Sequence, residues 1–323
     1  MVGCWLIAAG GACLLCSCGS MANNAARSQD RLPPAVDVAE STAILGETAF
    51  RATAVATIRQ PITTTKSGFA LMWHRSREIV VGNVPVSMSM LEVPAEQPGS
   101  EAFERFLDEQ GLPEREAGRV KCLVDGPGFF GEFDRQLAAA KKSVDVQVFI
   151  FDNDDIGVRY ARKLADKSAS VPVRVLFDDM GTNTAFMSPP LTPAPRGFVP
   201  PSDMKDCLEE NSKVRVRRTL NPWLVADHTK LLVFDNETAI LGGLNVGREY
   251  FSEWHDLMLK VEGPIVGSLA REFQSAWRQA GPWGDFSAFF PRREIQWPEA
   301  RGGEVPLRIL RTDAAAGRSE VLK

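Results

Sequence analysis

Side chains able to bind and transfer a phosphoryl group recur at fixed spacing in one stretch, residues 227–246. The pattern is H-x-K-x4-D-x6-G-G-x-N, formed by His228, Lys230, Asp235, Gly242, Gly243 and Asn245. An imidazole can act as a nucleophile or carry a proton, an ammonium supplies positive charge, and an amide supplies hydrogen-bond donors. This stretch is therefore a candidate site for phosphate chemistry.

The elements that position these side chains are predicted to be two antiparallel strands. Apolar runs at Leu231 to Phe234 and at Ala239 to Leu241 flank a cluster of turn-forming residues at 235–238. In a strand, successive side chains point to opposite faces, so His228 and Lys230 share a face.

The length of the turn decides which side chains meet. A two-residue turn places Lys230 opposite Gly243 and His228 opposite Asn245, so that the three polar groups share one small surface and the glycines leave room for a ligand. Asp235 differs, because it lies seven residues from His228. That separation is roughly 23 Å along a regular strand and ends on the opposite face, which predicts a turn or structural role.

Strands alternate with helices from residue 119 onward, and this alternation predicts an α/β fold. Strands are expected at 120–124, 144–151, 171–177, 214–218, 257–261 and 304–312, and helices at 131–142, 156–168 and 265–280. Residues 35–118 form an N-terminal region that is harder to interpret, with a helix expected at 100–110 and one or two strands at 78–91. The Pro-rich segment 181–200 is either a binding loop or a solvated connector.

Composition is that of a globular protein of 323 residues, with a formal net charge of −4 and a pI near 5.6. No global basic field therefore favours nucleic acid as a ligand. The basic run that includes Lys213 and Arg215 to Arg218 could contact an anionic headgroup or form an exposed strand face.

The N-terminus is apolar and predicts attachment to a membrane. Residues 1–18 resemble an export signal, and Leu15 to Cys18 resemble a bacterial lipobox in which Cys18 is lipidated. The alternative is an uncleaved apolar anchor, because Met1 to Trp5 contain no Lys or Arg. Residues 19–34 then form a tether, and the expected location is the bacterial cell envelope.

Cysteines support this assignment, since four of the six lie in the leader. Cys122 and Cys207 form either a disulfide or two free thiols. No His, Cys, Asp or Glu cluster has the spacing of a metal site, so we expect chemistry without a metal or another cofactor.

The pattern at 228–245 resembles the HKD motif of the phospholipase D superfamily, and in particular the first half of bacterial cardiolipin synthase-like enzymes. The resemblance extends over residues 119–312 and includes Val173 to Asp178, Trp254 to Asp256, and Gly263 to Trp277. It implies a mixed β-sheet flanked by helices at residues 119–300, a single HKD domain.

The resemblance also implies the roles of the site residues. Its catalytic set is His228, Lys230, Asp235, Asn245 and Asp256, and its substrate-binding residues are Gly242 and Gly243. In several members of the family a downstream acidic residue, here Asp256, holds the nucleophilic imidazole in one tautomer; the alternative for Asp256 is a salt bridge at the end of a strand. The implied reaction is phosphodiester cleavage through a phosphohistidine, with water or an alcohol as the acceptor.

One departure from the family is the single motif. A complete site uses two HKD motifs, whereas neither His74 nor His255 is followed by Lys two residues later. Either a homodimer supplies the second motif, or residues 301–323 begin a second half that is missing and a complementing chain is needed. The expected function is a phospholipase D-like phosphodiesterase or phosphatidyltransferase acting on phospholipid or another phosphodiester. The alternatives are a non-catalytic membrane-associated phosphate-binding protein and a dimeric nuclease of the same superfamily.

Overall fold

The computed structural model describes residues 38–81, 99–187, 190–313 and 318–319. The expected export signal, Cys18 and the tether lie outside these residues. None of the described helices combines the length and apolarity that crossing a membrane requires. The chain divides into two units, Met1–Thr42 and Ala43–Lys323, and the second unit contains the sheet and the motif.

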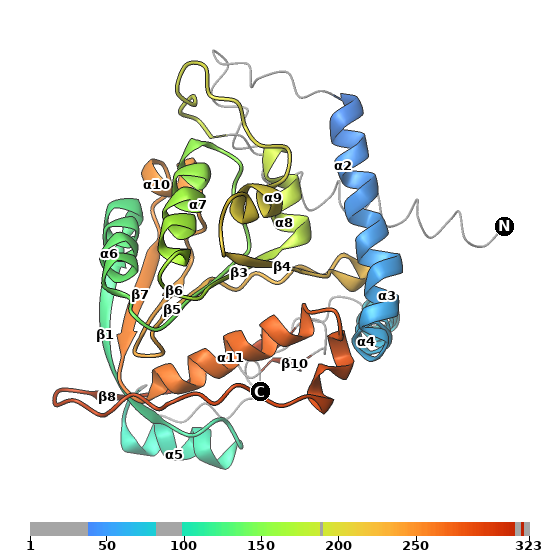
Figure 1. Cartoon of the computed structure of the whole chain (residues 1–323). Helices are drawn as coiled ribbons and strands as arrows, with labels where there is room; N and C mark the ends of the chain where they lie inside the picture. The colour runs from blue at the N-terminus through green and yellow to red at the C-terminus, as the bar shows by residue number, and fades with distance from the viewer. Residues whose placement is uncertain (1–37, 82–98, 188–189, 314–317, 320–323) are drawn as a thin grey trace. The chain divides into compact units, whose positions relative to one another are not determined.

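An eight-stranded sheet forms the centre of the second unit (Figure 1), in the order β4-β3-β2-β5-β6-β7-β1-β8. Strand β3 runs parallel to β2 and β4, and the other neighbouring pairs are antiparallel. The strands are β1 (Glu116–Val124), β2 (Val144–Val148), β3 (Val173–Asp178), β4 (Arg215–Thr219), β5 (Leu231–Phe234), β6 (Thr238–Gly242), β7 (Leu257–Glu262) and β8 (Val305–Leu307). A separate pair is formed by β9 (Thr312–Asp313) and β10 (Arg318–Ser319).

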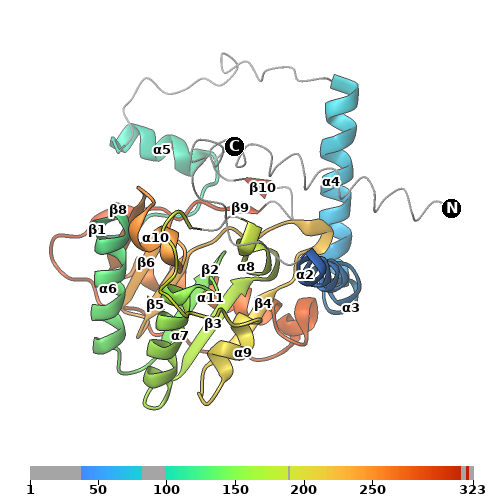
Figure 2. The same ribbon diagram turned by 90° about the horizontal axis from the view of Figure 1, so that it is seen from above.

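Helices cover both faces of this sheet (Figures 1 and 2). One face carries α6 (Asp125–Ala139), α7 (Asp155–Ser168) and α9 (Met204–Glu209), and the other carries α11 (Ile265–Gln279). The central strands are apolar on both sides as a result. In β5, Leu232 and Phe234 join the core under α6 and α7, while Leu231 and Val233 join the core under α11. The expected α/β fold, a mixed sheet flanked by helices, is confirmed.

Smaller elements complete the sheet's surroundings. They are α8 (Asp179–Thr184), η3 (Ala185–Met187), η4 (Pro222–Leu224), α10 (Arg248–Ser252) and η5 (Gly284–Phe289). Helix α6 begins six residues before the predicted start at 131, at Asp125, which has a φ of 57°. The strand predicted at 304–312 is short, because only Val305–Leu307 pairs with β1.

The hairpin β5–β6 has a different register from the predicted one. Phe234 pairs with Thr238, so residues 235–237 form a three-residue connection and Lys230 lies beside Gly242 instead of Gly243. Asp235 and Asn236 both have a φ of 58°. Asp and Asn tolerate this left-handed conformation better than other non-glycine residues, so the turn forms there and adds one residue to the loop.

The N-terminal region is helical up to residue 81. It contains α2 (Val38–Phe50), η1 (Arg51–Val55), α3 (Ala56–Arg59) and α4 (Pro61–Val81), followed after a gap by α5 (Glu101–Glu109). The helix expected at 100–110 is confirmed. The strand predicted at 78–91 is wrong over residues 78–81, which continue α4, and the rest of it lies outside the described residues. A run of alternating residues at a helix end satisfies a strand pattern by coincidence.

Candidate active site

The His228 side chain lies in the loop between η4 and β5, at the end of the sheet where β2 and β3 also end. Residue His228 is exposed, and its ring packs against Phe149 with 4.6 Å between the ring centroids. Burial and the nearby Lys230 charge lower the pKa of His228, and the Asp227 carboxylate opposes them. A lowered pKa keeps the imidazole neutral at neutral pH, and the neutral ring is the nucleophilic form.

Lys230 is buried and lies against the same Phe149 ring. Its Nζ donates to the main-chain oxygen of His228 at 2.9 Å and lies 5.1 Å from the centroid of the Phe149 ring. Burial lowers the pKa of Lys230 to about 8, although Asp227, Asp256 and Asp178 each raise it. An ammonium with one hydrogen bond from its three hydrogens retains donors for an anionic group.

Buried polar groups hold the loop that carries His228. Asp178 Oδ2 accepts from the Asp227 main-chain N–H and from Asn221 Nδ2, both at 2.7 Å. Gln147 Nε2 donates to Asp227 Oδ2 at 2.9 Å. Burial raises the pKa of Asp178 to about 7 even though these donors oppose it. The sequence did not predict this supporting role for Asp178, Asn221 or Gln147. The available signal was a polar residue at the end of, or inside, an apolar strand pattern, as at Asp178 and Gln147.

The same loop has two residues in the left-handed region, Trp223 at φ 59° and Leu224 at φ 58°. Such a conformation costs about 1–3 kcal/mol per residue and persists only where surrounding contacts hold it. Trp223 Nε1 donates to the Thr64 main-chain oxygen of α4 at 2.8 Å, and a Cβ at Gly68 would lie 3.0 Å from that nitrogen. Helix α4 therefore supports the loop that precedes His228.

Asn245 is buried after β6 and ties two loops together. Its Oδ1 accepts from the main-chain N–H of Ile150 at 2.9 Å, and the neighbouring Val246 N–H donates to the Ile150 oxygen. The carbonyl of this amide is thus used within the protein, and the side chain also hydrogen-bonds that of Tyr250. The amide nitrogen carries two hydrogens, so one donor could contact a phosphate.

The space beside Gly242 and Gly243 is filled by protein atoms. The prediction that these glycines leave room for a ligand is therefore wrong. A Cβ at Gly243 would lie 2.1 Å from Asp256 Oδ2, and one at Gly242 would lie 2.3 Å from the Leu257 main-chain oxygen. Asp256 Oδ1 also accepts from the Leu257 N–H at 2.7 Å. Within the described part of the chain no hydrogen bond joins Asp256 to the His228 ring, and the contribution of Asp256 to the site is its negative charge near Lys230.

Asp235 lies at the other end of the hairpin. Its carboxylate accepts from the main-chain N–H groups of Lys141, Lys142 and Ser143, at 2.9, 2.7 and 2.9 Å. The Asp235 N–H donates in turn to the Ser143 oxygen. These contacts fasten the turn to the segment between α6 and β2, away from His228.

Other sequence predictions concern residues near the site. Cys122 and Cys207 are free thiols. The described residues include no group of three or more His, Cys, Asp or Glu that could hold a metal. Of the basic run, Arg217 lies over the Trp277 ring and Arg218 pairs with Asp203, so these two guanidinium groups already have partners.

The loop at 181–200 begins with α8 and then follows the surface. Main-chain N–H groups of Leu191 and Thr192 donate to the Glu253 carboxylate, at 2.8 and 2.7 Å. This attachment fixes the loop to the segment just before Asp256. This contact is compatible with both expectations for the loop, a binding loop and a solvated connector.

Comparison with known proteins gives the families that this part of the chain resembles. Residues 133–277 match the family described as "Cardiolipin synthase, PLD-like domain". Cardiolipin synthase 1 of Bacillus cereus is 30% identical over 226 residues, which are 64% of this chain and 42% of that protein. Cardiolipin synthase of Oceanobacillus iheyensis is 32% identical over 168 residues, 50% of this chain and 33% of that protein. The chain thus matches less than half the length of these relatives.

Solved structures with a similar arrangement are more distant. A phospholipase D family member, Nuc from Salmonella typhimurium, aligns with a TM-score of 0.38 at 16% identity, over 51% of this chain and 97% of that one. Phosphatidylserine synthase from Haemophilus influenzae aligns with a TM-score of 0.36 at 13% identity, over 52% of this chain and 39% of that one. The family assignment depends on the sequence matches.

Proposed function

We propose that this chain is a member of the phospholipase D superfamily, since residues 133–277 match the family described as "Cardiolipin synthase, PLD-like domain", and that this domain transfers phosphatidyl groups between alcohols. The proposed substrate is a phospholipid, as the names of the relatives suggest. Transfer to a lipid hydroxyl would give a diphosphatidyl product such as cardiolipin, and transfer to water would give phosphatidic acid.

One observation carries this proposal: the exposed His228 imidazole, whose pKa is lowered, and the buried Lys230 ammonium lie against the same Phe149 ring, with 4.6 Å between the ring centroids and 5.1 Å from Lys230 Nζ to the Phe149 centroid. The imidazole supplies a nucleophile at neutral pH, and the ammonium supplies positive charge where a phosphate oxygen would become more negative. The nearby Lys230 charge disfavours the protonated form of His228, because like charges repel. A purely structural histidine would gain nothing from such a neighbour.

The proposed reaction has two steps. A ring nitrogen of His228 attacks phosphorus, the bond from phosphorus to the leaving alcohol oxygen breaks, and a second imidazole donates a proton to that oxygen. An acceptor hydroxyl then attacks phosphorus, the bond to His228 breaks, and the second imidazole, now neutral, removes the proton of that hydroxyl. Lys230 and the amide nitrogen of Asn245 contact the phosphate oxygens throughout. We assign Asp256 to positioning, through its charge near Lys230.

The second imidazole has to come from another HKD motif. His255 does not replace it in this proposal, because its Nδ1 is paired with Asp125 Oδ1 at 2.7 Å and no Lys follows two residues later. The partner is therefore either a second copy of this chain or a complementing chain with the other motif.

Phosphatidylglycerol vesicles give a direct test, since cardiolipin consists of two phosphatidyl groups joined through one glycerol. His228→Ala should abolish both cardiolipin or phosphatidic acid formation and the trapping of a labelled phosphohistidine. Loss of a covalent nucleophile costs several orders of magnitude, on the order of 10⁶-fold in a well-characterised hydrolase. Thr229→Ala, at the exposed neighbouring position, is the matched control. Unchanged turnover in His228→Ala would reject the proposal.

Mixing distinguishes the two kinds of partner. If two copies of this chain share one site, a 1:1 mixture of native and His228→Ala chains should retain roughly one quarter of the activity, because only native homodimers have both imidazoles. Retention of one half would show that each copy works alone. If the pure chain is inactive and a complementing chain restores turnover, the site is completed by that chain. Binding of anionic headgroups without any product would support the non-catalytic alternative.

A further inference from the structure

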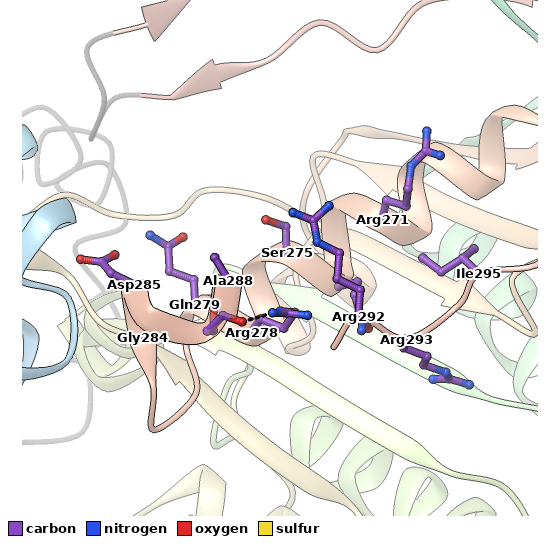
Figure 3. Close-up of a pocket in the computed structure, with 12 residues that line it drawn as sticks. Arg271, Ser275, Arg278, Gln279, Gly284, Asp285, Ala288, Arg292, Arg293 and Ile295 are labelled. Atoms are coloured by element: carbon purple, nitrogen blue, oxygen red, sulfur yellow. Dashed lines mark hydrogen bonds between the residues drawn. The ribbon is translucent and has the colours of Figure 1, made fainter. Parts of the chain in front are cut away.

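The outer surface of α11 contains a cavity that no residue of the HKD motif lines. The cavity has a volume of about 400 Å³ and lies between the C-terminal half of α11, η5 and the segment that follows η5 (Figure 3). Its lining includes Arg271, Arg278, Arg292, Arg293, Gln279 and Asp285.

The four arginines give this cavity a positive charge without a paired acid. Arg271 donates to Ser268 Oγ at 2.9 Å, and Arg278 donates to the main-chain oxygen of Pro291 at 3.0 Å. Arg292 and Arg293 are exposed and have no hydrogen bond or ion pair with any residue that the structure describes. No salt bridge to a carboxylate neutralises any of the four within the described ranges.

The single carboxylate of the lining is already used. Both oxygens of Asp285 accept from Thr63 of α4, from its hydroxyl at 2.5 Å and from its main-chain N–H at 2.8 Å. Asp285 therefore fastens η5 to α4 and does not reach the guanidinium groups. Several unpaired guanidinium groups around one small cavity are the arrangement that binds a phosphate.

Exposed aromatic rings occur in the same segment of the chain, residues 283–297, between and beside the residues that line the cavity. Phe289 is 84% exposed, and Trp283, Phe286, Phe290 and Trp297 are each more than two fifths exposed. Trp283 and Phe290 contact each other with 5.0 Å between centroids, and Arg271 lies 4.2 Å from the Trp297 ring. An exposed cluster of large aromatic side chains marks a surface that binds a partner.

We propose that this arginine–aromatic face, residues 271–297, docks onto an anionic phospholipid bilayer. The guanidinium groups hold a lipid phosphate in the cavity, while the aromatic rings enter the interfacial region. Arginine attracts anionic headgroups, and amphipathic aromatic rings favour the boundary between headgroups and acyl chains. A nucleic acid fits less well, because its backbone requires a groove that follows successive phosphates and this compact cavity accommodates one.

The docking requires no residue of the His228 site, and it can be tested in a chain that cannot turn over lipid. The full-length His228→Ala chain is mixed with phosphatidylcholine vesicles that contain phosphatidylglycerol, or with pure phosphatidylcholine vesicles. Flotation gives the affinity. Hydrogen exchange of the 284–297 amides reports on this face separately from any attachment through the N-terminus. The test variant adds Arg292→Glu and Arg293→Glu, and the control adds Arg162→Glu and Arg196→Glu, two exposed arginines elsewhere with the same charge change.

We expect protection of the 284–297 amides on anionic vesicles but not on neutral ones, and its loss in the Arg292/Arg293 variant. The affinity should fall at least about thirtyfold, the change that corresponds to about 1 kcal/mol for each basic residue at an anionic surface. The Arg162/Arg196 control should keep the protection. Phe289→Ser should weaken binding without changing the preference for anionic lipid.

Four results would overturn the proposal. They are unchanged protection in the Arg292/Arg293 variant, equal loss of protection in the control, equal protection on neutral vesicles, and no protection of the 284–297 amides on any vesicle. Glycerol phosphate in solution and duplex DNA serve as competitors. Each is added at a phosphate concentration no higher than that of the vesicles. Protection of the 284–297 amides by either competitor would reassign the cavity to a soluble phosphate or a nucleic acid. Failure of this docking leaves phosphohistidine formation at His228 untouched.

Discussion

The two ends of the β5–β6 hairpin carry residues of one sequence motif and have opposite characters. At one end, the exposed His228 ring and the buried Lys230 ammonium both lie against Phe149. At the other end, the Asp235 carboxylate accepts three main-chain N–H groups from residues 141–143. At the first end Lys230 Nζ makes a single hydrogen bond among the described residues, whereas at the second end the carboxylate is satisfied by three main-chain N–H groups of the protein itself.

The comparison shows that fixed spacing does not imply shared chemistry. His228 and Lys230 are placed for a ligand, whereas Asp235 fixes the turn and with it the register of β5. Register matters at the reactive end, because a shift of one residue would move every side chain of the strand to the other face. Asp235 thus acts on the reactive end through the strand it anchors. Substitutions at the two ends should affect different measurements.

Among substitutions that keep the His228 nucleophile, the largest effect on the reaction rate is expected for Lys230→Met. Methionine has a similar length and is apolar, so burial is kept while the positive charge is lost. The rate of phosphohistidine formation should fall about 10²–10³-fold, the cost of removing one group that stabilises developing charge. The free energy of unfolding should stay the same or rise, because a partly desolvated charge is removed. Lys142→Met, at an exposed lysine near the other end, should leave the rate unchanged. A Lys230→Met chain with native rate would show that the ammonium does not contact phosphate.

An intermediate effect, on stability instead of rate, is expected for Asp235→Asn. Asparagine keeps the left-handed conformation of this position but removes the charge that accepts the three N–H groups. We expect the free energy of unfolding to fall by about 1–3 kcal/mol, with the phosphohistidine yield of the folded fraction unchanged. Denaturant unfolding gives the first quantity and trapping gives the second.

Glu237→Gln provides the control for Asp235→Asn. Glu237 is exposed, pairs with Lys142 at 2.7 Å and lies in the same loop. An exposed pair of this kind contributes only about 0–1 kcal/mol. A loss of stability in Glu237→Gln as large as that in Asp235→Asn would show that any charge change in the loop is destabilising. A rate defect in folded Asp235→Asn would place Asp235 in the chemistry.

The sequence was sufficient for the elements that local patterns determine. The apolar runs at β2, β3 and β5 and the amphipathic pattern of α11 predicted those elements, and the remote position of Asp235 followed from strand length alone. The register of the hairpin did not follow, because it depends on whether Asp235 and Asn236 both adopt a positive φ. That choice is settled by the contacts of Asp235 with residues 141–143, which are distant in sequence.

The supporting residues of the site escaped prediction for the same reason. The loop at 221–227 is held by residues distant in sequence. Asp178 accepts from the Asp227 N–H, 49 residues away, and Thr64 accepts from Trp223, 159 residues away. Gly243 was predicted to leave space for a ligand, yet Asp256 fills that space. A pattern gives the type and spacing of the reactive groups, whereas the positions of their neighbours depend on pairing between distant segments.

The smallest expected effect is a pH dependence that belongs to the reactive end alone. The His228 nucleophile must be neutral, and its pKa is lowered from 6.5, so the rate should fall with decreasing pH only below that value. Lys230 must be protonated, and its pKa is about 8, so the rate should fall as the pH rises above 8. At pH 9 the rate should be about tenfold lower than on the plateau. Lys230→Arg keeps its charge and should lose the alkaline fall, whereas Asp235→Asn should retain both limbs. A rate that still falls above pH 8 in Lys230→Arg would assign the alkaline limb to another group and remove the distinction in charge between the two ends of the hairpin.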